Sequence, residues 1–338
     1  MNPFENRGKA SEDGRASENM DKKDVTALLT VAVFLTVLSV IFGAVRLASA
    51  AKVRRVNVLL ATRSCVSCEL GAVNLNHADL SGVNLEYSSL EGSQLYNTTL
   101  HRANLAGVRF NQANMIRADL RQAYLVGAVM ARSRLDDAVL EAADLRLVYL
   151  GDASLRRADL ENTVLTEAVL SRADLGKANL RFSNLFGANL AEANLSGANL
   201  EGADMRRVYL GDASLKNAIL LNAQLSGANL SRTNLQNANL RGAQLGNADL
   251  TMARLEGASL RQALLERARI MRANLTNADL TGANLRQASL QQTNLSNTNL
   301  TGANLLGANI KDANLEGAIL CNTTMPGGRV VRRDCVLD

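Results

Sequence analysis

The cysteines and histidines of this 338-residue chain, six residues in all, are the first candidates for redox, metal-binding or proton-transfer chemistry. They are Cys65, Cys68, Cys321, Cys335, His77 and His101. The C-x-x-C spacing of Cys65 and Cys68 is typical of thiol–disulfide exchange and of zinc sites. The two histidines are the candidates for proton transfer at neutral pH. Which of these chemistries is available depends on the elements that position the six residues.

The first part of the chain contains one long apolar segment. Residues 1–24 mix both charges with Gly, Ser and Asn and predict a disordered tail. Residues 25–45 then carry no charge, and about 20 apolar residues suffice to cross a bilayer. We predict a transmembrane helix over residues 25–47. A cleaved signal peptide is the alternative, because two lysines precede the segment and Ala-Ser-Ala follows it at residues 48–50.

A five-residue repeat fills most of the remaining sequence. From Leu70 to Met325 every fifth residue is large and apolar, and 45 of these 52 residues are Leu. A small residue, most often Ala, lies two places before each of them, and Asn or Asp most often lies directly before it. The sequence divides accordingly into a linker and N-terminal cap at residues 48–69, repeats at residues 70–325 and a C-terminal cap or tail at residues 326–338.

A period of five fits neither a helix nor a continuous strand. Five residues advance an α-helix by about 500°, so the leucines do not gather on one helix face. In a continuous strand, an odd spacing places successive leucines on opposite faces. If each unit is instead a short extended edge followed by a corner, the small residue and the Leu both point inward. The chain then winds into a parallel β-solenoid with layers about 4.8 Å apart. Proline, which lacks the N–H that such a ladder needs, is absent from the repeats, and Gly and Asn suit the corners.

Units such as ANLSG at 193–197 and ADLTG at 278–282 resemble the pentapeptide-repeat family. This resemblance implies an all-β fold: a right-handed, quadrilateral, parallel β-helix with four units per coil. The flanks LLATRSCVSCEL at 59–70 and LCNTTMPGG at 320–328 resemble membrane-anchored, cyanobacterial-type members. We therefore expect a single-pass protein of a bacterial plasma or thylakoid membrane, with the side of the repeats left open.

The predicted rod separates the two cysteine pairs. Four units per coil give about thirteen layers and a length of about 60 Å, so one zinc site cannot use all four thiols. A redox role for Cys65 and Cys68 lacks the strand-to-helix setting of thioredoxin-type thiols, and packing at the rod end is the simpler interpretation. Cys321 and Cys335 are predicted to form a local disulfide if the compartment is oxidising. We expect no metal and no cofactor.

The outward positions suggest a binding surface rather than a reaction centre. Residues 70–325 contain 24 Lys or Arg and 23 Asp or Glu, so we do not expect a nucleic-acid partner. The aromatic candidates for protein contact are Tyr149 and Tyr209, which lie 60 residues apart in two copies of VYLGDASL. The basic candidates are Arg102, Arg109, Arg117 and Arg121.

The sequence therefore predicts a non-enzymatic, membrane-anchored scaffold that binds an unidentified protein and no small-molecule substrate. A DNA-mimicking topoisomerase (gyrase) binder is one alternative, although such mimicry requires a strongly negative surface. A thiol redox protein that uses Cys65 and Cys68 is the other.

Overall fold

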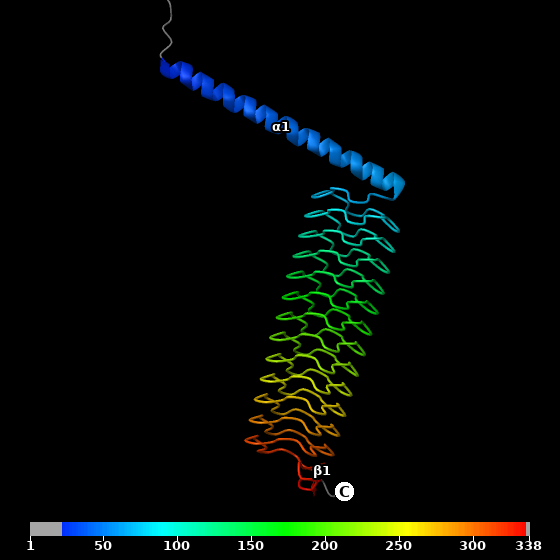
Figure 1. Ribbon diagram of the computed structural model, residues 1–338, viewed down its shortest axis with the longest axis vertical. Helices are drawn as coiled ribbons and strands as arrows, with labels where there is room; N and C mark the ends of the chain where they lie inside the picture. The colour runs from blue at the N-terminus through cyan, green and yellow to red at the C-terminus, as the bar shows by residue number, and fades with distance from the viewer. Residues whose placement is uncertain (1–21, 336–338) are drawn as a thin grey trace, which may run out of the picture. The chain divides into compact units, whose positions relative to one another are not determined.

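The computed structural model describes residues 22–335 as two compact units that divide between Val53 and Arg54 (Figure 1). The first unit contains most of the helix α1, Lys22–Thr62. The second contains the end of α1, the repeats, and the short strands β1, Thr323–Thr324, and β2, Val330–Val331. Most of the tail predicted at residues 1–24 lies outside the described residues, while residues 22–24 begin the helix.

The helix α1 corrects one prediction. No helix in the described part of the chain is long and apolar enough to cross a membrane. The helix continues beyond its apolar part through Lys52, Arg54 and Arg55. The predicted transmembrane helix at 25–47, the single-pass membrane localisation and the membrane as a partner are therefore wrong.

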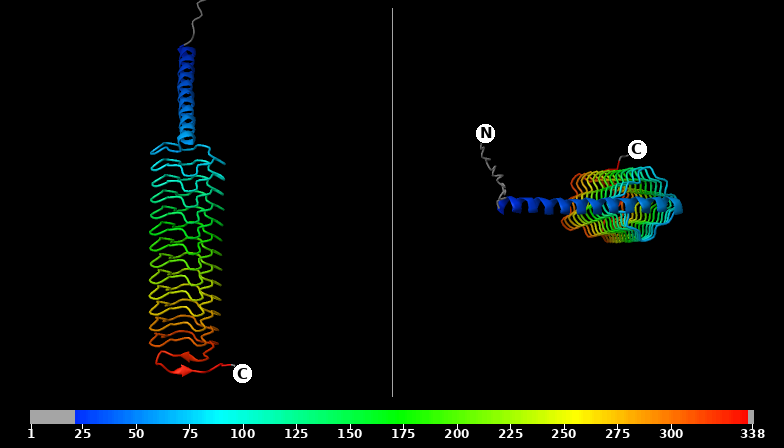
Figure 2. Two further views of the ribbon diagram at one scale, coloured as in Figure 1. Left: turned by 90° about the vertical axis from the view of Figure 1, so that its right-hand side faces the viewer. Right: turned by 90° about the horizontal axis from the view of Figure 1, so that it is seen from above.

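The repeats form a solenoid with four pentapeptides in each coil. Parallel bridges join each residue that directly precedes a central Leu to the residue twenty positions later, as in Asn194 to Ser214. The bridges continue from Ser64 to Thr324, and Figure 2 shows the coils stacked along the unit. Each edge contributes a single bridging residue, so the repeats form isolated bridges rather than strands of several residues. The reason is geometric, since a corner every five residues leaves no room for a longer extended segment.

The backbone hydrogen bonds of one pentapeptide explain why the coil is stable. In the unit at 193–197, the Ala193 N–H donates to Leu190 O and closes the corner (3.1 Å). The N–H groups of Asn194, Leu195 and Gly197 donate to the neighbouring coils at 2.9, 2.7 and 2.8 Å. The remaining N–H, that of Ser196, donates to Asn194 Oδ1 (3.1 Å). Every donor of the unit is thus satisfied, as a buried or half-buried backbone requires.

The corners confirm the expected backbone conformation. The second residue after each Leu has positive φ, both where it is glycine, as at Gly82 (64°), and where it has a side chain, as at Leu147 (58°). A positive φ there, combined with the closing hydrogen bond, is the geometry of a type II turn. Glycine adopts it without steric cost, and other residues adopt it at some cost.

The interior is filled by the Leu column of each face and the small residues beside it. Side chains from Leu80 to Leu245 at the central positions are almost completely buried, and the inward Ala, Val, Ser and Thr residues are buried as well. The few inward hydroxyl groups bond to backbone carbonyls, as Thr233 Oγ1 does to Leu210 O (2.8 Å). The interior is therefore a packed, largely apolar core.

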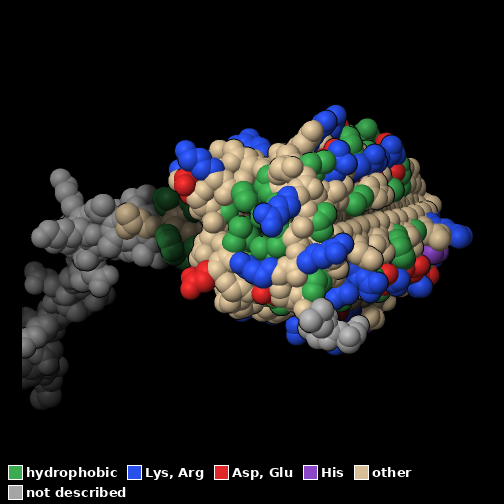
Figure 3. Space-filling view, turned by 90° about the horizontal axis from the view of Figure 1, so that it is seen from below, with side chains coloured by type: hydrophobic (Ala, Val, Ile, Leu, Met, Phe, Trp, Pro, Cys, Tyr) green, Lys and Arg blue, Asp and Glu red, His purple; other side chains and the backbone are tan. Residues whose placement is uncertain are grey.

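The two ends of the solenoid are covered differently. At the N-terminal end, the last turns of α1 contribute the fully buried Leu59, and Arg55 donates to Glu69 O (2.9 Å). At the C-terminal end, β1 and β2 pair antiparallel, and the side chains of Ile310 and Leu315 in the last coil stay only partly buried. Figure 3 shows hydrophobic side chains exposed at this end with Lys and Arg around them. At the N-terminal end, α1 extends to Thr62 and so occupies part of the segment predicted as linker and cap at 48–69.

Candidate functional site

The outward side chains lie on four faces, each built from one pentapeptide per coil. We name them the Tyr149 face, with centres every twenty residues from Leu70, and the Leu75, Leu80 and Leu85 faces, whose centres repeat in the same way from those residues. Within a unit, the residue before the Leu is position −1, and the two after it are positions +1 and +2. These three positions point outward, whereas the small residue and the Leu point inward.

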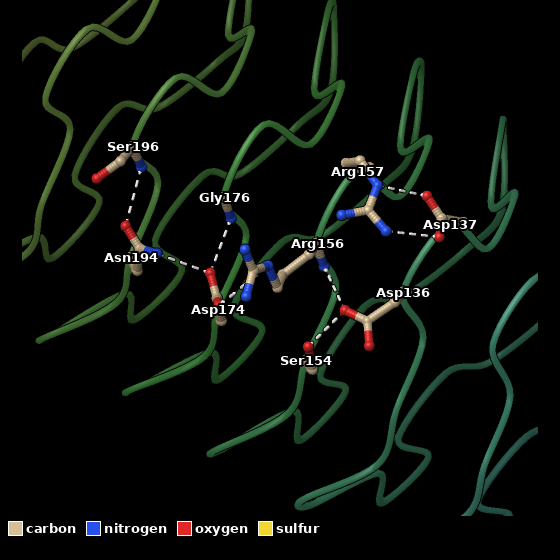
Figure 4. Close-up of polar contacts among 9 residues, drawn as sticks. All are labelled: Asp136, Asp137, Ser154, Arg156, Arg157, Asp174, Gly176, Asn194 and Ser196. Carbon is tan, nitrogen blue, oxygen red and sulfur yellow. Dashed lines mark hydrogen bonds and ion pairs between the residues drawn. The ribbon is translucent and has the colours of Figure 1, made fainter.

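The Asn or Asp at position −1 has a definite structural role. Its Oδ1 accepts a hydrogen bond from the N–H at position +1, as Figure 4 shows for Asp174 with Gly176 (3.0 Å) and Asn194 with Ser196 (3.1 Å). The amide of Asn194 also donates to Asp174 Oδ1 in the preceding coil (2.8 Å). These side chains therefore stabilise the rod, and their abundance is no sign of catalysis.

Arginine–carboxylate pairs neutralise much of the surface charge. Some join consecutive coils, as in the bidentate pair of Arg157 with Asp137, whose two N–H···O distances are both 2.7 Å (Figure 4). Others lie within one unit, as in Arg206 with Asp204 (2.8 and 2.6 Å). The hydrogen bonds from these guanidinium groups lower the pKa values of Asp137 and Asp204 below the ordinary range of an aspartate. Both carboxylates are therefore charged at neutral pH and are poor general bases.

The two candidate tyrosines lie in one column. Tyr149 and Tyr209 both occupy position −1 of the Tyr149 face, three coils apart, and they are 40% and 42% exposed. A Cβ added to Gly151 would come within 2.8 Å of the Tyr149 hydroxyl, and one on Gly211 within 3.0 Å of the Tyr209 hydroxyl. Each ring therefore lies over a glycine at position +1 and presents its other side to solvent. The duplicated sequence thus produces two equivalent aromatic platforms.

The four candidate arginines do not form one patch. Arg109 lies on the Tyr149 face, 3.2 Å from Glu91, and Arg117 lies on the Leu75 face, where it donates to the Tyr96 hydroxyl (3.2 Å). Arg102 and Arg121 share the Leu80 face, but Arg102 donates to a glutamine (2.7 Å) and Arg121 pairs with an aspartate (2.6 Å). Spacing along the chain had suggested a cluster, whereas the coil distributes the four residues over three faces.

All four cysteines are in disulfides at the ends of the solenoid. Cys321 and Cys335 are joined, with their Cα atoms 4.7 Å apart. Cys65 and Cys68 are also joined, and Cys65 is buried in the core. The Cys321–Cys335 disulfide attaches the segment after β2 to the last coil, where Arg333 Nη2 donates to Ala318 O (3.1 Å).

The histidines lie apart from one another. His77 is on the Leu75 face, in edge contact with the ring of Tyr96, and its Nδ1 lies 3.3 Å from Asn97 Nδ2. His101 is on the Leu80 face. Among the described residues, no group of three or more His, Cys, Asp or Glu side chains is placed to hold a metal ion.

A pocket of about 280 Å³ opens on the Leu85 face, and the sequence analysis did not find it. We call it the Leu147 pocket, and its lining residues come from three consecutive coils: Tyr124, Val126, Arg146, Leu147, Thr166 and Glu167. Leu147 is 57% exposed at position +2, where polar residues or Gly usually lie. The sequence does contain one indication of this pocket, because Tyr124 and Val164 replace the usual Asn or Asp at position −1. The lining side chains, however, are about 20 and 40 residues apart in sequence, and only a coil length of twenty residues shows that they are neighbours.

A larger polar hollow, of about 400 Å³, lies on the Tyr149 face between Thr251 and Asp312. Its Arg272 donates to Gln292 Oε1 at 2.8 Å, so these two lining side chains are paired with each other.

Comparisons with known proteins agree on the fold family. The family model for pentapeptide repeats matches overlapping segments that together cover most of residues 65–325. HetL, a pentapeptide-repeat protein involved in heterocyst differentiation regulation from the cyanobacterium Nostoc sp. strain PCC 7120, is 29% identical. The alignment covers 82% of this chain and 98% of HetL, with a TM-score of 0.27.

Two further solved structures are similar over shorter regions. Rfr23 from the cyanobacterium Cyanothece 51142 is 42% identical over 25% of this chain and 58% of its own, with a TM-score of 0.25. QnrB1, a plasmid-mediated fluoroquinolone resistance protein, is 18% identical over 51% of this chain and 84% of its own, with a TM-score of 0.23. No curated protein matches the chain.

Pentapeptide repeats fold as right-handed, quadrilateral β-helices, in agreement with the twenty-residue coil found here. With the repeat model matching well over half of its residues, this chain belongs to the pentapeptide-repeat family.

Proposed function

We propose that this protein is a non-enzymatic scaffold that binds a partner protein on the outward faces of its solenoid. The observation that carries the proposal is the pair of equivalent aromatic platforms at Tyr149 and Tyr209 on one face. Exposed tyrosines held flat against a rigid backbone lose little side-chain entropy on binding, and tyrosine is enriched among residues that dominate protein interfaces. The packed interior leaves only the outer surface for recognition.

The rest of the surface supports binding over catalysis. Carboxylates such as those of Asp137 and Asp204 are held in ion pairs with arginines, and Asn and Asp side chains at position −1 are engaged in hydrogen bonds of the repeat. General acid–base catalysis requires a group with an accessible proton and a pKa close to the working pH. The Arg-paired aspartates have pKa values shifted away from that range.

The proposal is tested by proximity labelling with the full chain, comparing wild type with a Tyr149→Asn/Tyr209→Asn double variant. Asparagine is the usual residue at position −1, so the variant is expected to fold. We expect specific labelled proteins to be lost in the double variant and retained when two asparagines of the Leu75 face, Asn234 and Asn274, are replaced by Ser. Unchanged labelling in the Tyr variant would reject this surface, and steady substrate turnover by the purified protein would reject the non-enzymatic scaffold itself.

A further inference from the structure

We propose that the Leu147 pocket binds an extended segment of a partner protein, which inserts an aliphatic or aromatic side chain between Tyr124 and Leu147. This inference rests on the proposed function and specifies the site and the chemistry of the partner. Val126 forms part of the same wall, and Tyr124 is 44% exposed. Apolar side chains around a recess, with polar groups at the rim, are the usual composition of a binding pocket.

The structure gives no stabilising role to the large apolar side chain of Leu147 at its exposed corner position. Its φ of 58° lies in the left-handed region, which is unfavourable for a side chain of this kind and favourable for Gly or Asn. Its side chain is also 57% exposed, so the core does not compensate for the backbone conformation. Positive φ is common to position +2 of the units, including the exposed Met252 (60°), so what distinguishes Leu147 is its place beside Tyr124 and Val126 around one recess. A cluster of exposed apolar side chains indicates a role in recognition, whereas a single one does not.

Two backbone donors at the pocket have no acceptor in the described structure. The N–H groups of Val126 and Thr166 occupy position +1, where Oδ1 of an Asn or Asp at position −1 normally accepts. Position −1 is Tyr124 in the first unit and Val164 in the second, so neither supplies an oxygen. In the coil between them the bond is intact, from the Arg146 N–H to Asp144 Oδ1 (3.2 Å). The missing bond occurs at other non-Asx units too, but here two such N–H groups flank an apolar recess.

These donors select the kind of partner. A chain that uses both of them must bring free carbonyl oxygens on either side of its apolar side chain. An α-helix uses its carbonyls internally except in its last turn, whereas an extended segment leaves them available. A second copy of this chain already uses most of its carbonyls between coils, as the bonds of the unit at 193–197 show. The geometry therefore fits an extended peptide.

The test uses the full-length protein and a peptide selected on it from a displayed library of short random peptides. We expect Leu147→Asn to raise the dissociation constant of the selected peptide about tenfold or more, because it removes one apolar wall of the pocket. Asn tolerates the left-handed conformation, so this variant is expected to fold. The matched control is Met252→Asn, which makes the same replacement at another exposed corner with positive φ (60°) and should leave affinity unchanged.

A second variant tests the backbone donors. Val164→Asn supplies an oxygen to the Thr166 N–H from within the chain. It should therefore raise the melting temperature of the protein and lower its affinity for the peptide. Selected peptides that bind Leu147→Asn as tightly as wild type would overturn the pocket, as would peptides that bind only as helices. Self-association of the rod that Leu147→Asn abolishes would also overturn it and assign the pocket to a second copy.

These outcomes separate the two proposals. If Leu147→Asn is without effect and Tyr149→Asn/Tyr209→Asn removes binding, the pocket fails and the scaffold stands. If the protein converts a substrate, the scaffold itself fails.

Discussion

Truncating a leucine in the middle of the solenoid should cost far more than truncating its counterpart in the last coil. Leu215 and Leu315 occupy the same face, five coils apart, and each follows an inward Ala by two residues. Leu215 is fully buried with coils on both sides, whereas Leu315 is only partly buried. Leu215→Ala should lower the free energy of unfolding by about 2–5 kcal/mol, the usual range for a fully buried leucine. Leu315→Ala should cost about half of that or less, because its site is already open to water on one side.

The measurement is urea denaturation of the full chain, followed by circular dichroism, with hydrogen exchange to locate the weakened coils. Since each coil contacts only its neighbours, exchange should increase near residue 215 in one variant and near the C-terminal end in the other. Equal losses of stability in the two variants, or a loss below about 1 kcal/mol for Leu215→Ala, would refute the single packed interior on which the fold description depends.

Three further predictions concern charge, packing and the C-terminal disulfide. Arg206 lowers the folded pKa of Asp204, so this pair stabilises the fold above the ordinary aspartate pKa near 3.9 and the contribution is lost as pH falls below it. Arg206→Gln should flatten the pH dependence of the melting temperature in that acid range and leave it unaltered between pH 5 and pH 8, and identical acid profiles would contradict the assignment. Ala198→Phe should overpack the interior and lower the free energy of unfolding by about 1–3 kcal/mol or more, whereas Ala198→Val, a residue that other units have at this position, should lower it less. An Ala198→Phe protein with an unchanged melting temperature would argue against close packing. Cys335→Ser should increase hydrogen exchange in β1 and β2 and leave the middle coils unaffected, and unchanged exchange would show that the disulfide with Cys321 is not needed to hold this cap.

The period of the sequence was sufficient to predict the solenoid, because the inward and outward sides of every unit follow from residue type. Leucine at the centre, a small residue two places earlier and polar residues elsewhere have only one arrangement with a common interior. The number of units per coil was not available from the residues alone. The two VYLGDASL segments are separated by 60 residues, which is a multiple of both fifteen and twenty, so they cannot distinguish three sides from four. The bridges from each residue to the one twenty positions later settle it.

The placement of the candidate contact residues on the faces of the solenoid was predictable to different degrees for the same reason. Tyr149 and Tyr209 share a face because 60 is a multiple of the coil length, and this placement needed no further information. The four arginines are close in sequence, but most of their spacings differ widely from twenty, so the coil distributes them over three faces. Only Arg102 and Arg121, which are nineteen residues apart, share one. Membership of one face depends on position within the coil, and closeness along the chain carries no such information.

The position −1 residues connect the stability of this fold to its capacity for recognition. Where Asn or Asp is present, as at Asp144, its oxygen satisfies the N–H two residues later and the surface is polar and closed. Where Tyr124 or Val164 replaces it, the same position carries an apolar side chain and the N–H two residues later has no internal acceptor in the described structure, whereas beside Val129 a neighbouring coil supplies one, Asn111 Oδ1 to the Ala131 N–H (3.0 Å). One such substitution therefore supplies both features that the proposed binding surface needs, an apolar contact and a free donor, and it does so without disturbing the interior. A repeat protein can place such substitutions on any coil at small cost to stability, which is why we expect the departures from the signature at Tyr124, Tyr149 and Val164 to be better guides to binding than the conforming units around them.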